Sequence, residues 1–329
     1  MVFDGPGWLL RLGWMTDALL QRLFAADDDV KLLPDAIQWR GRVVPRTGGI
    51  YRFRQDDGYN QSFAMQWKKF QREQYDDVNG TTLSRDRIAA ATRWNLTDLR
   101  GELILEAGCG AGRFTRLLAQ SGAELVTFDY SSAVEVSHEM NHQFPNVTFL
   151  QSDIFDMPFR DGAFDRVFCY GVLQHTPDPE QAFHRLAAKV RPGGCISVDI
   201  YPRDFKIRPS KSKYLWRWLT TRMDKERLLR LLQWYIPRWL PWDTRIKRIP
   251  KIGKYLGSVI PCWNYYYTPL TPEDQVRWAI MDTFDALAPQ YDKPAMKSQV
   301  QRWFERAGLT KIDVRRGSNG ILGNGVKPV

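Results

Sequence analysis

The residues best suited to chemistry lie in the stretch LILEAGCGAGRFT, residues 103–115. Gly108, Gly110 and Gly112 recur at two-residue spacing directly after a short, largely apolar run. This pattern predicts a loop that closes a strand and opens a helix. Glycine lets the backbone of such a loop approach a ligand closely, and the start of the helix contributes unpaired N–H groups. Many nucleotide ligands fit that description.

Spacing excludes two common nucleotide-binding loops. The dinucleotide fingerprint GxGxxG requires glycine where this chain has Arg113, and the P-loop requires a GK[ST] ending that is absent. The pattern present here is E-x-G-x-G-x-G, which begins at Glu106.

Alternating strands and helices must position this loop. From Gly101 onward the pattern predicts strands at 103–106, 124–129, 147–151, 165–170 and 195–201, separated by helices at 113–121, 133–143 and 179–190. A helix at 297–307 and strands at 310–315 and 321–326 follow later in the chain. This order predicts an α/β fold with a parallel sheet and helices on both faces.

The N-terminal region and the segment after residue 202 lie outside this pattern. We predict an amphipathic helix at 6–26, extended pieces around the Gly48-Gly49 turn, a helix within 56–77 and another from 84 to 98. The predicted division is an N-terminal lid at 1–98, a cofactor-binding core at 99–202, a basic helical insertion at 203–290, and a C-terminal part at 291–329 that completes the sheet.

Four motifs in order resemble those of class I S-adenosylmethionine-dependent methyltransferases. LEAGCGAG is similar to the first motif, VTFDYS to the second and LQSDIFDMPF to the third. Residues 164–201, with their proline-glycine turn, resemble the segment that follows. The resemblance covers residues 101–201 and implies a Rossmann-like, seven-stranded sheet with S-adenosylmethionine as cofactor.

The resemblance also implies roles for the motif residues. Asp129 would accept hydrogen bonds from the ribose diol, with a solvated turn as the alternative. Asp153 would accept from the adenine amine, or cap a helix, while Ile154 packs on the ring. Glu106 would lie near the methionine end or orient the loop. The cofactor residues implied are Glu106, Gly108, Gly110, Gly112, Asp129, Tyr130, Asp153, Ile154 and Tyr170. Because this cofactor has no phosphate, we assign Arg113 to the surface or to a salt bridge.

His175 is the candidate catalytic base. It follows the fourth predicted strand, at the carboxyl edge of the sheet where ligands of such folds bind. A base near pH 7 suits methylation of a hydroxyl, although a structural role in the loop is the alternative. Signatures of nucleic-acid base methylation are missing here. The chain has CYGV in place of an Asn/Asp-Pro-Pro-aromatic run, and Cys169 lacks a preceding proline and is expected to be buried in a strand.

One segment carries the positive charge of the chain. The net charge is +10, and residues 203–254 hold 16 Lys or Arg against 4 Asp or Glu, which leaves the remainder near −2 (10 minus 12). Six of the 13 tryptophans lie at 203–270, in a helical pattern that Pro237 and Pro241 are predicted to break. Three interpretations stay open: a cap over the active site, a surface for anionic membrane or a lipid-linked acceptor, and an RNA groove.

Two further stretches resemble a group of bacterial methyltransferases associated with cell-surface glycan or secondary-metabolite pathways. In one, Gln66 and Trp67 match a segment that folds over the cofactor. In the other, Asp282, Asp285 and Tyr291 become candidate acceptor contacts, with helix capping and core packing as the alternative. The zinc-ribbon cysteines of some related enzymes are missing, so no metal is expected.

We therefore expect methyl transfer to a hydroxyl of a sugar, a lipid-linked glycan or another small metabolite. The alternatives are an RNA methyltransferase, although nucleic acid is the less favoured partner, and a non-catalytic subunit that binds the cofactor. The four scattered cysteines indicate reduced thiols, and no apolar run of about 18 residues or secretory signal is found. A cytoplasmic protein follows, with contact to the inner face of the membrane through residues 203–254 as an option.

Overall fold

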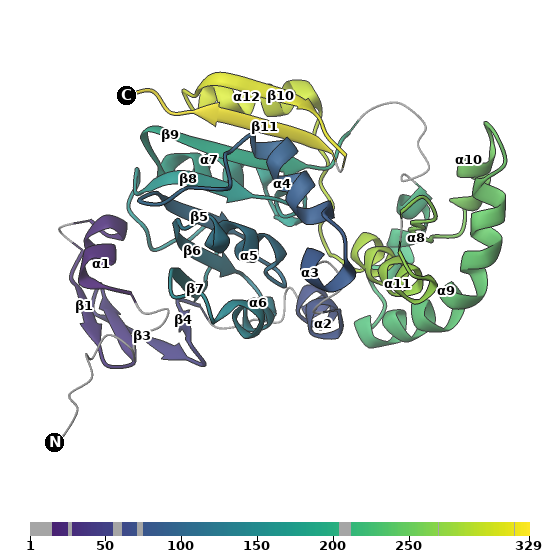
Figure 1. Ribbon diagram of the computed structural model, residues 1–329, viewed down its shortest axis with the longest axis horizontal. Helices are drawn as coiled ribbons and strands as arrows, with labels where there is room; N and C mark the ends of the chain where they lie inside the picture. The colour runs from purple at the N-terminus through teal and green to yellow at the C-terminus, as the bar shows by residue number, and fades with distance from the viewer. Residues whose placement is uncertain are drawn as a thin grey trace.

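The computed structural model describes residues 15–25, 28–54, 61–70, 75–203, 212–268, 270–318 and 320–329. These residues form one eleven-stranded sheet in the order β1-β2-β3-β4-β7-β6-β5-β8-β9-β11-β10 (Figure 1). Its strands are β1 (Val30–Leu33), β2 (Ala36–Trp39), β3 (Arg42–Thr47), β4 (Ile50–Arg52), β5 (Leu103–Ala107), β6 (Glu124–Asp129), β7 (Val147–Gln151), β8 (Phe164–Cys169), β9 (Val190–Ile200), β10 (Thr310–Arg316) and β11 (Ile321–Val326).

The predicted parallel sheet is confirmed for five central strands. β7, β6, β5, β8 and β9 are parallel neighbours, while β11 and β10 are added antiparallel at the β9 edge. β5 has β6 on one side and β8 on the other, so the strand order reverses direction there. Ligands of such sheets bind outside the carboxyl ends of the strands at this reversal.

Helices cover both faces of the sheet, as predicted. One hydrophobic core joins the sheet to α1 (Asp17–Leu23), α7 (Pro179–Lys189) and α12 (Lys297–Arg306). A second core joins the opposite face to α4 (Leu83–Thr92), α5 (Arg113–Gln120) and α6 (Ala133–Asn141). The buried stripe of each helix is short and apolar, for example Phe114 and Leu118 on α5. Burial of such stripes supplies most of the stability of helices this short.

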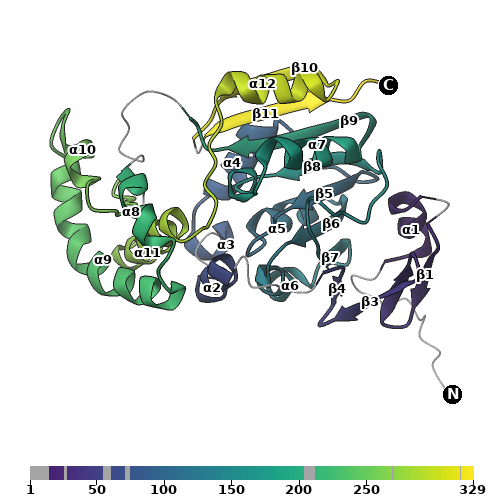
Figure 2. The ribbon, with the colours of Figure 1, turned by 180° about the vertical axis from the view of Figure 1, so that it is seen from behind.

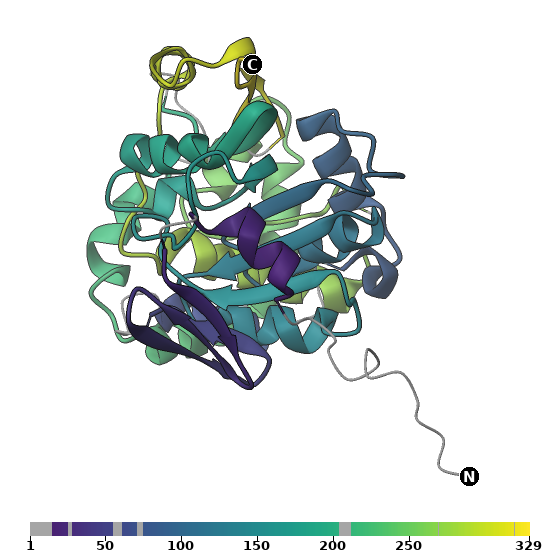
Figure 3. The ribbon, with the colours of Figure 1, turned by 90° about the vertical axis from the view of Figure 1, so that its left-hand side faces the viewer.

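The N-terminal strands extend the sheet and do not lie over its carboxyl edge. β4 pairs in parallel with β7, and β3, β2 and β1 follow as an antiparallel meander. Figures 1 and 2 show this meander and α1 at the end of the molecule farthest from α8 to α11, and Figure 3 views the molecule from that end. Among the described residues of the predicted lid at 1–98, those near the glycine loop include Trp67 on α2 (Gln61–Lys69) and Tyr75, which precedes α3 (Asp76–Asn79).

Three predicted element boundaries were wrong. The helix predicted at 6–26 is described only from Asp17, where Thr16 accepts a hydrogen bond from Leu19 N, and residues 1–14 lie outside the described residues. The helix predicted to reach Asp98 ends at Thr92, because Arg93 adopts a left-handed conformation with φ of 59°. β9 begins at Val190 and includes the predicted proline-glycine turn.

The segment after β9 forms a helical lobe beside the carboxyl edge of the sheet (Figures 1 and 2). It contains α8 (Lys213–Thr220), α9 (Lys225–Lys247), α10 (Gly253–Gly257) and α11 (Pro272–Leu287) around a core of its own. The predicted break at Pro237 and Pro241 was wrong, since α9 is continuous through both. Both prolines lie on the exposed side of the helix, where the carbonyl groups that lose their N–H partners can be hydrated.

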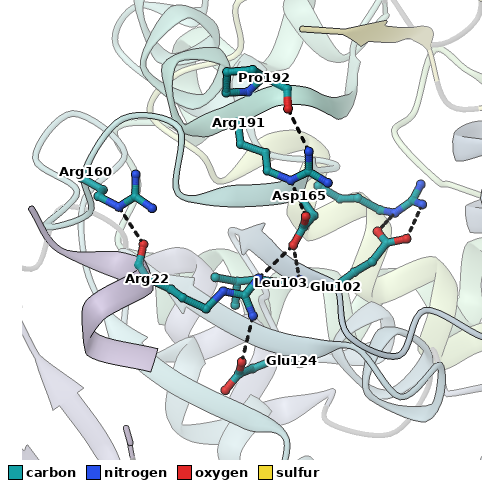
Figure 4. Close-up of polar contacts among 9 residues, drawn as sticks. Arg22, Glu102, Leu103, Glu124, Arg160, Asp165, Arg191 and Pro192 are labelled. Carbon is teal, nitrogen blue, oxygen red and sulfur yellow. Dashed lines mark hydrogen bonds and ion pairs between the residues drawn. The ribbon is translucent and has the colours of Figure 1, made fainter. Parts of the chain in front are cut away.

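A polar network closes the opposite edge of the sheet (Figure 4). Asp165 accepts hydrogen bonds from Leu103 N at 2.7 Å and from the Arg22 guanidinium at 3.0 Å, and it pairs with Arg191. Burial would raise the pKa of Asp165, but the bond from Leu103 and the two arginines outweigh it, so the pKa is lowered. Arg22 also reaches Glu124 at 3.4 Å. One carboxylate thus joins α1, β5 and β8, far from the carboxyl edge.

Glycines of β11 allow α12 to pack closely on the sheet. A Cβ atom at Gly323 would lie 2.6 Å from the Phe304 ring, which is fully buried. We expect Gly323→Ala to destabilise the fold by about 1–3 kcal/mol through overpacking. Urea unfolding checks the mechanism when it is measured for this variant, for Phe304→Leu and for the double variant. Because the Leu side chain is smaller, the double variant should lose less stability than the two single variants lose in sum. Additive losses would contradict it.

Candidate functional site

A cleft of about 1560 Å³ lies at the carboxyl ends of the central strands. The glycine loop, the ends of β6, β8 and β9, and the helices α2 and α11 supply its walls. The structure brings together at this cleft most residues singled out in the sequence, namely Gly108, Gly110, Asp129, Tyr130, Asp153, Ile154, Tyr170 and His175. Glu106 and Gly112 are not among the described residues that line it.

The glycine loop is shaped by left-handed backbone at alternate residues. Gly108, Gly110 and Gly112 have φ of 80°, 53° and 88°, values that other residue types adopt only with strain. The amide groups of Gly108 and Cys109 both donate to Phe128 O, which ties the loop to the end of β6. A Cβ atom at Gly108 would also lie 2.3 Å from the Val172 side chain.

Asp129 is half-buried at the end of β6 and holds the loop from the side. Its Oδ2 accepts from Gly110 N at 3.0 Å, while Oδ1 accepts from Ser131 N at 2.9 Å and from Ser131 Oγ at 2.8 Å. Burial raises the pKa of Asp129, and these hydrogen bonds oppose the rise. A carboxylate has about four acceptor positions, so this one can still accept from a ligand hydroxyl in the cleft.

Glu106 is buried beneath the loop. Its Oε2 accepts from Thr115 Oγ1 on α5 at 2.6 Å and from Thr127 Oγ1 on β6 at 2.7 Å. Burial raises the pKa of Glu106 to about 7, and the two hydroxyl bonds oppose that rise. This position fits the alternative in which Glu106 orients the loop.

The N-terminal segment is fastened onto the loop by a contact that the sequence did not indicate. Tyr75 Oη donates to Ala111 O at 2.5 Å and accepts from Asn141 Nδ2 at 3.0 Å. The Trp67 ring lies over Gly110, where an added Cβ would be 3.0 Å from Nε1. Trp67 was singled out as part of a cover, whereas Tyr75 and Asn141 carried no recognisable motif.

Asp153 and Ile154 line the side of the cleft nearest β7, and Tyr170 lines it just beyond the end of β8. Asp153 Oδ1 accepts from Phe155 N at 2.9 Å, which is a local turn bond, and the residue also borders the cleft. Ile154 is buried. The Tyr170 hydroxyl is 2.8 Å from Ser197 Oγ, and its ring stacks on Phe168 with centroids 4.3 Å apart.

His175 is buried at the other side of the cleft. Its Nδ1 lies 3.0 Å from the backbone oxygen of Tyr291, and its ring packs edge-on against Tyr201. A carbonyl oxygen only accepts, so Nδ1 must carry the proton in this bond. In neutral imidazole this tautomer leaves the acceptor lone pair on Nε2.

Two carboxylates of α11 face the same cleft. Asp282 accepts from the Tyr265 hydroxyl, and Asp285 Oδ2 accepts from Tyr201 Oη at 3.2 Å. Burial and the neighbouring Asp285 raise the pKa of Asp282 to about 7, against the influence of Arg113 and Arg87. Asp282 therefore changes between a hydrogen-bond donor and a pure acceptor near neutral pH.

Arg113, which the sequence assigned to the surface or to a salt bridge, is partly buried and lies near acidic residues. Arg113 borders the cleft, and its guanidinium lies 4.5 Å from the Phe114 ring centroid. Burial, with the nearby Arg87, lowers the pKa of Arg113 to about 9, although Asp282 and Asp199 favour its charge. The spacing argument removed a phosphate partner for Arg113, but it could not anticipate the acidic residues that α11 brings from far along the chain.

Neither a metal site nor a membrane span emerges from the part of the chain that the structure describes. It holds no group of three or more His, Cys, Asp or Glu able to bind a metal ion. None of its helices combines the length and apolar character needed to cross a bilayer. All four cysteines are free thiols, and Cys169 is buried in β8 as predicted.

Comparison with known proteins agrees with this geometry. Residues 105–198 match the family model described as "Methyltransferase domain". An uncharacterised protein of Synechococcus is 35% identical over 218 residues, which cover 63% of this chain and 47% of that protein. A ubiquinone biosynthesis O-methyltransferase of Coxiella burnetii is 32% identical over 110 residues, or 33% of this chain and 47% of the relative. The chain thus spans about half the length of these relatives.

The similarity to one solved structure supports the fold alone. Phosphoethanolamine N-methyltransferase 2 of Haemonchus contortus, in complex with S-adenosyl-L-methionine, aligns with a TM-score of 0.50 and 14% identity over 88% of this chain and 62% of that chain. By the family match, residues 105–198 form a methyltransferase domain of the class I, S-adenosylmethionine-dependent type. S-adenosylmethionine is the methyl donor of this domain.

The raised pKa of Glu106 predicts a pH-dependent stability. Between its unfolded pKa near 4.5 and its folded pKa of about 7, the folded chain keeps a proton that the unfolded chain releases, so stability falls as pH rises through this window. Between pH 5 and pH 8 the free energy of unfolding of the wild type should fall by at most about 3 kcal/mol through this group, and Glu106→Gln should remove that fall. Urea unfolding at several pH values measures this slope. Glu139→Gln, on the exposed side of α6, is the control, and a slope unchanged in Glu106→Gln would contradict the assignment.

Proposed function

We propose that this protein transfers the methyl group of S-adenosylmethionine to a hydroxyl of a sugar, a lipid-linked glycan or another small metabolite. The observation that carries this proposal is the bond from His175 Nδ1–H to Tyr291 O at 3.0 Å. That bond leaves the acceptor lone pair of the neutral ring on Nε2, and His175 borders the cleft that contains the glycine loop. A hydroxyl must lose its proton to accept a methyl group, and a positioned imidazole suits that task at neutral pH.

The residues of the cleft fit the cofactor. In our proposal Asp129 accepts from the ribose diol, Asp153 from the adenine amine, and Ile154 packs on the adenine ring. Gly108 and Gly110 let the loop backbone approach the methionine end, and Tyr130 and Tyr170 add flanking contacts. Glu106 and Gly112 act indirectly, since both lie outside the cleft lining and support the loop.

S-adenosylmethionine supplies a methyl group on a sulfonium that is already a good leaving group. The chain is then required mainly to position the acceptor, exclude water and remove one proton. Trp67 and Tyr75 cover the glycine loop, and both border the cleft. His175 holds the transferred proton on Nε2, with its ring orientation fixed by Tyr291 O.

The part of the cleft that we assign to the methyl acceptor is lined by polar and aromatic side chains. Asp282, Asp285 and the hydroxyls of Tyr201 and Tyr265 offer several hydrogen-bonding groups at once. Such a surface suits an acceptor rich in hydroxyls.

We further propose that the basic segment at 203–254 contacts an anionic membrane, because its described part exposes Trp218 and Trp234 among lysines and arginines.

The role of His175 is tested by the reaction itself. His175→Gln removes the base but keeps a neutral polar side chain, so turnover should fall by about 10²- to 10⁴-fold while binding of S-adenosylhomocysteine is retained. Turnover is followed with labelled methyl donor and fractionated cell extract, as label entering glycan, lipid or small molecules. His184→Gln on α7 is the control. Full turnover in His175→Gln would refute the base, and label entering RNA alone would refute the acceptor class.

The role of Asp129 is tested by calorimetric titration with S-adenosylhomocysteine. Asp129→Ala removes a charged acceptor, so affinity should fall by roughly 10- to 100-fold. Asp35→Ala, in the exposed turn between β1 and β2, should bind as the wild type does. No binding by the wild type, or unchanged affinity in a folded Asp129→Ala, would contradict the assignment.

A further inference from the structure

A second cavity, of about 470 Å³, lies within the helical lobe and away from the glycine loop. We call it the apolar groove. Its walls come from α8, α9 and the segment that precedes Cys262. The side chains that dominate it are Trp216, Leu228, Leu231, Leu232, Trp234 and Ile260.

Three polar side chains around the groove donate to backbone oxygens of the protein, whereas the buried Trp239 Nε1 has no hydrogen-bond partner among the described residues. Thr220 Oγ1 donates to Leu287 O at 2.9 Å, the Tyr235 hydroxyl donates to Pro261 O, and Trp216 Nε1 donates to Val259 O at 2.8 Å. The groove therefore offers an incoming molecule mainly apolar contact. An apolar chain is the chemistry that such walls bind best.

The mouth of the groove is open to solvent. Trp234 is 61% exposed, Leu231 43% and Ile260 37%. Fourteen of the nineteen exposed large hydrophobic side chains in the described part of the chain lie between Tyr214 and Ile260. An exposed apolar surface of this extent marks an interaction site.

The positive charges around the groove favour an anionic ligand. Arg238 lines it, with its guanidinium 5.3 Å from the Trp234 ring centroid. Arg227, Arg230, Arg245 and Arg248 are exposed on the same helix or its end. Within residues 212–260 there are 12 Lys or Arg and 3 Asp or Glu. Tryptophan and arginine around an apolar site match a hydrocarbon chain that carries an anionic head.

The groove and the cleft share one wall. On α11, Ala286 borders the cleft and Leu287 the groove, and on α8 Tyr214 borders the cleft and Trp216 the groove. The two cavities are therefore about one helix diameter, some 10 Å, apart. A single amphiphile can reach both.

We propose that the apolar groove binds the hydrocarbon chain of an anionic lipid, and that it holds a lipid-linked acceptor with its polar end at the cleft. The second part rests on the proposed methyl transfer. The first part, binding of the chain, stands on the groove alone and is measured without any turnover.

The test uses dodecyl phosphate below its micelle concentration, titrated into the full chain by calorimetry. The wild type should bind it, and the double variant Leu231→Lys with Ile260→Lys should bind at least about tenfold more weakly, because its side chains obstruct the groove. These substitutions add positive charge, so electrostatic attraction alone would strengthen binding. Leu256→Lys, an exposed position outside the groove lining, is the matched control and should bind like the wild type.

Each outcome decides the proposal. Retained binding of S-adenosylhomocysteine by all variants shows that they are folded, and keeps a failure of the groove distinct from a failure of the methyltransferase assignment. No binding of dodecyl phosphate by the wild type, or equal binding by the double variant, would overturn the groove. Salt-sensitive binding of a single-stranded RNA that excludes dodecyl phosphate would overturn it in favour of an RNA surface.

Discussion

The conformation of the glycine loop depends on two carboxylates, the buried Glu106 and the half-buried Asp129. Glu106 fixes the loop from below, through the hydroxyls of Thr115 and Thr127, and Asp129 fixes it from the side, through Gly110 N. Burying a carboxyl is costly unless hydrogen bonds satisfy it, and here the bonds come from three different elements, α5, β6 and the loop itself. The cradle is thus preorganised by the ends of β5 and β6, so a ligand does not need to order it. This arrangement also explains why Glu106 matters without bordering the cleft.

The described cover of the loop comes from chain that precedes the core. Tyr75 bonds to Ala111 O and Asn141, while Trp67 packs on Gly110. Gly112 has no room for a side chain, because an added Cβ would lie 2.4 Å from Asn141 Nδ2. The glycine spacing therefore serves two purposes, since Gly108 and Gly110 open the backbone toward the cleft and Gly112 admits the contact that fastens the N-terminal segment.

Sequence predicted the parts of the fold that depend on local pattern. Strand-helix alternation and the motif around Asp129 were sufficient for the five parallel strands, because buried strands and amphipathic helices have short periods. Contacts between distant residues could not be predicted from local pattern. The pairing of β4 with β7 joins residues about a hundred positions apart, and the sequence of neither strand indicates which residues pair. Tyr291 O orients His175 from 116 residues away, and Arg113 lies near Asp282 of α11. Pro237 is tolerated in a continuous helix because it lies on the exposed side of α9, and sequence alone did not predict which side of the helix is exposed.

The wall between the cleft and the apolar groove is held by buried polar contacts. Lys213 pairs with Asp292, whose carboxylate is almost fully buried, and Arg217 donates to Ala286 O at 3.0 Å and Pro289 O at 2.8 Å at the end of α11. A cation at the C-terminus of a helix satisfies carbonyl groups that have no partner within the helix. Because these contacts fix α8 to the end of α11, Trp216 of the groove wall is held in place relative to Asp282 and Asp285 of the cleft. In our proposals, the hydrocarbon chain and the methyl acceptor therefore lie on opposite sides of a wall that these contacts hold together.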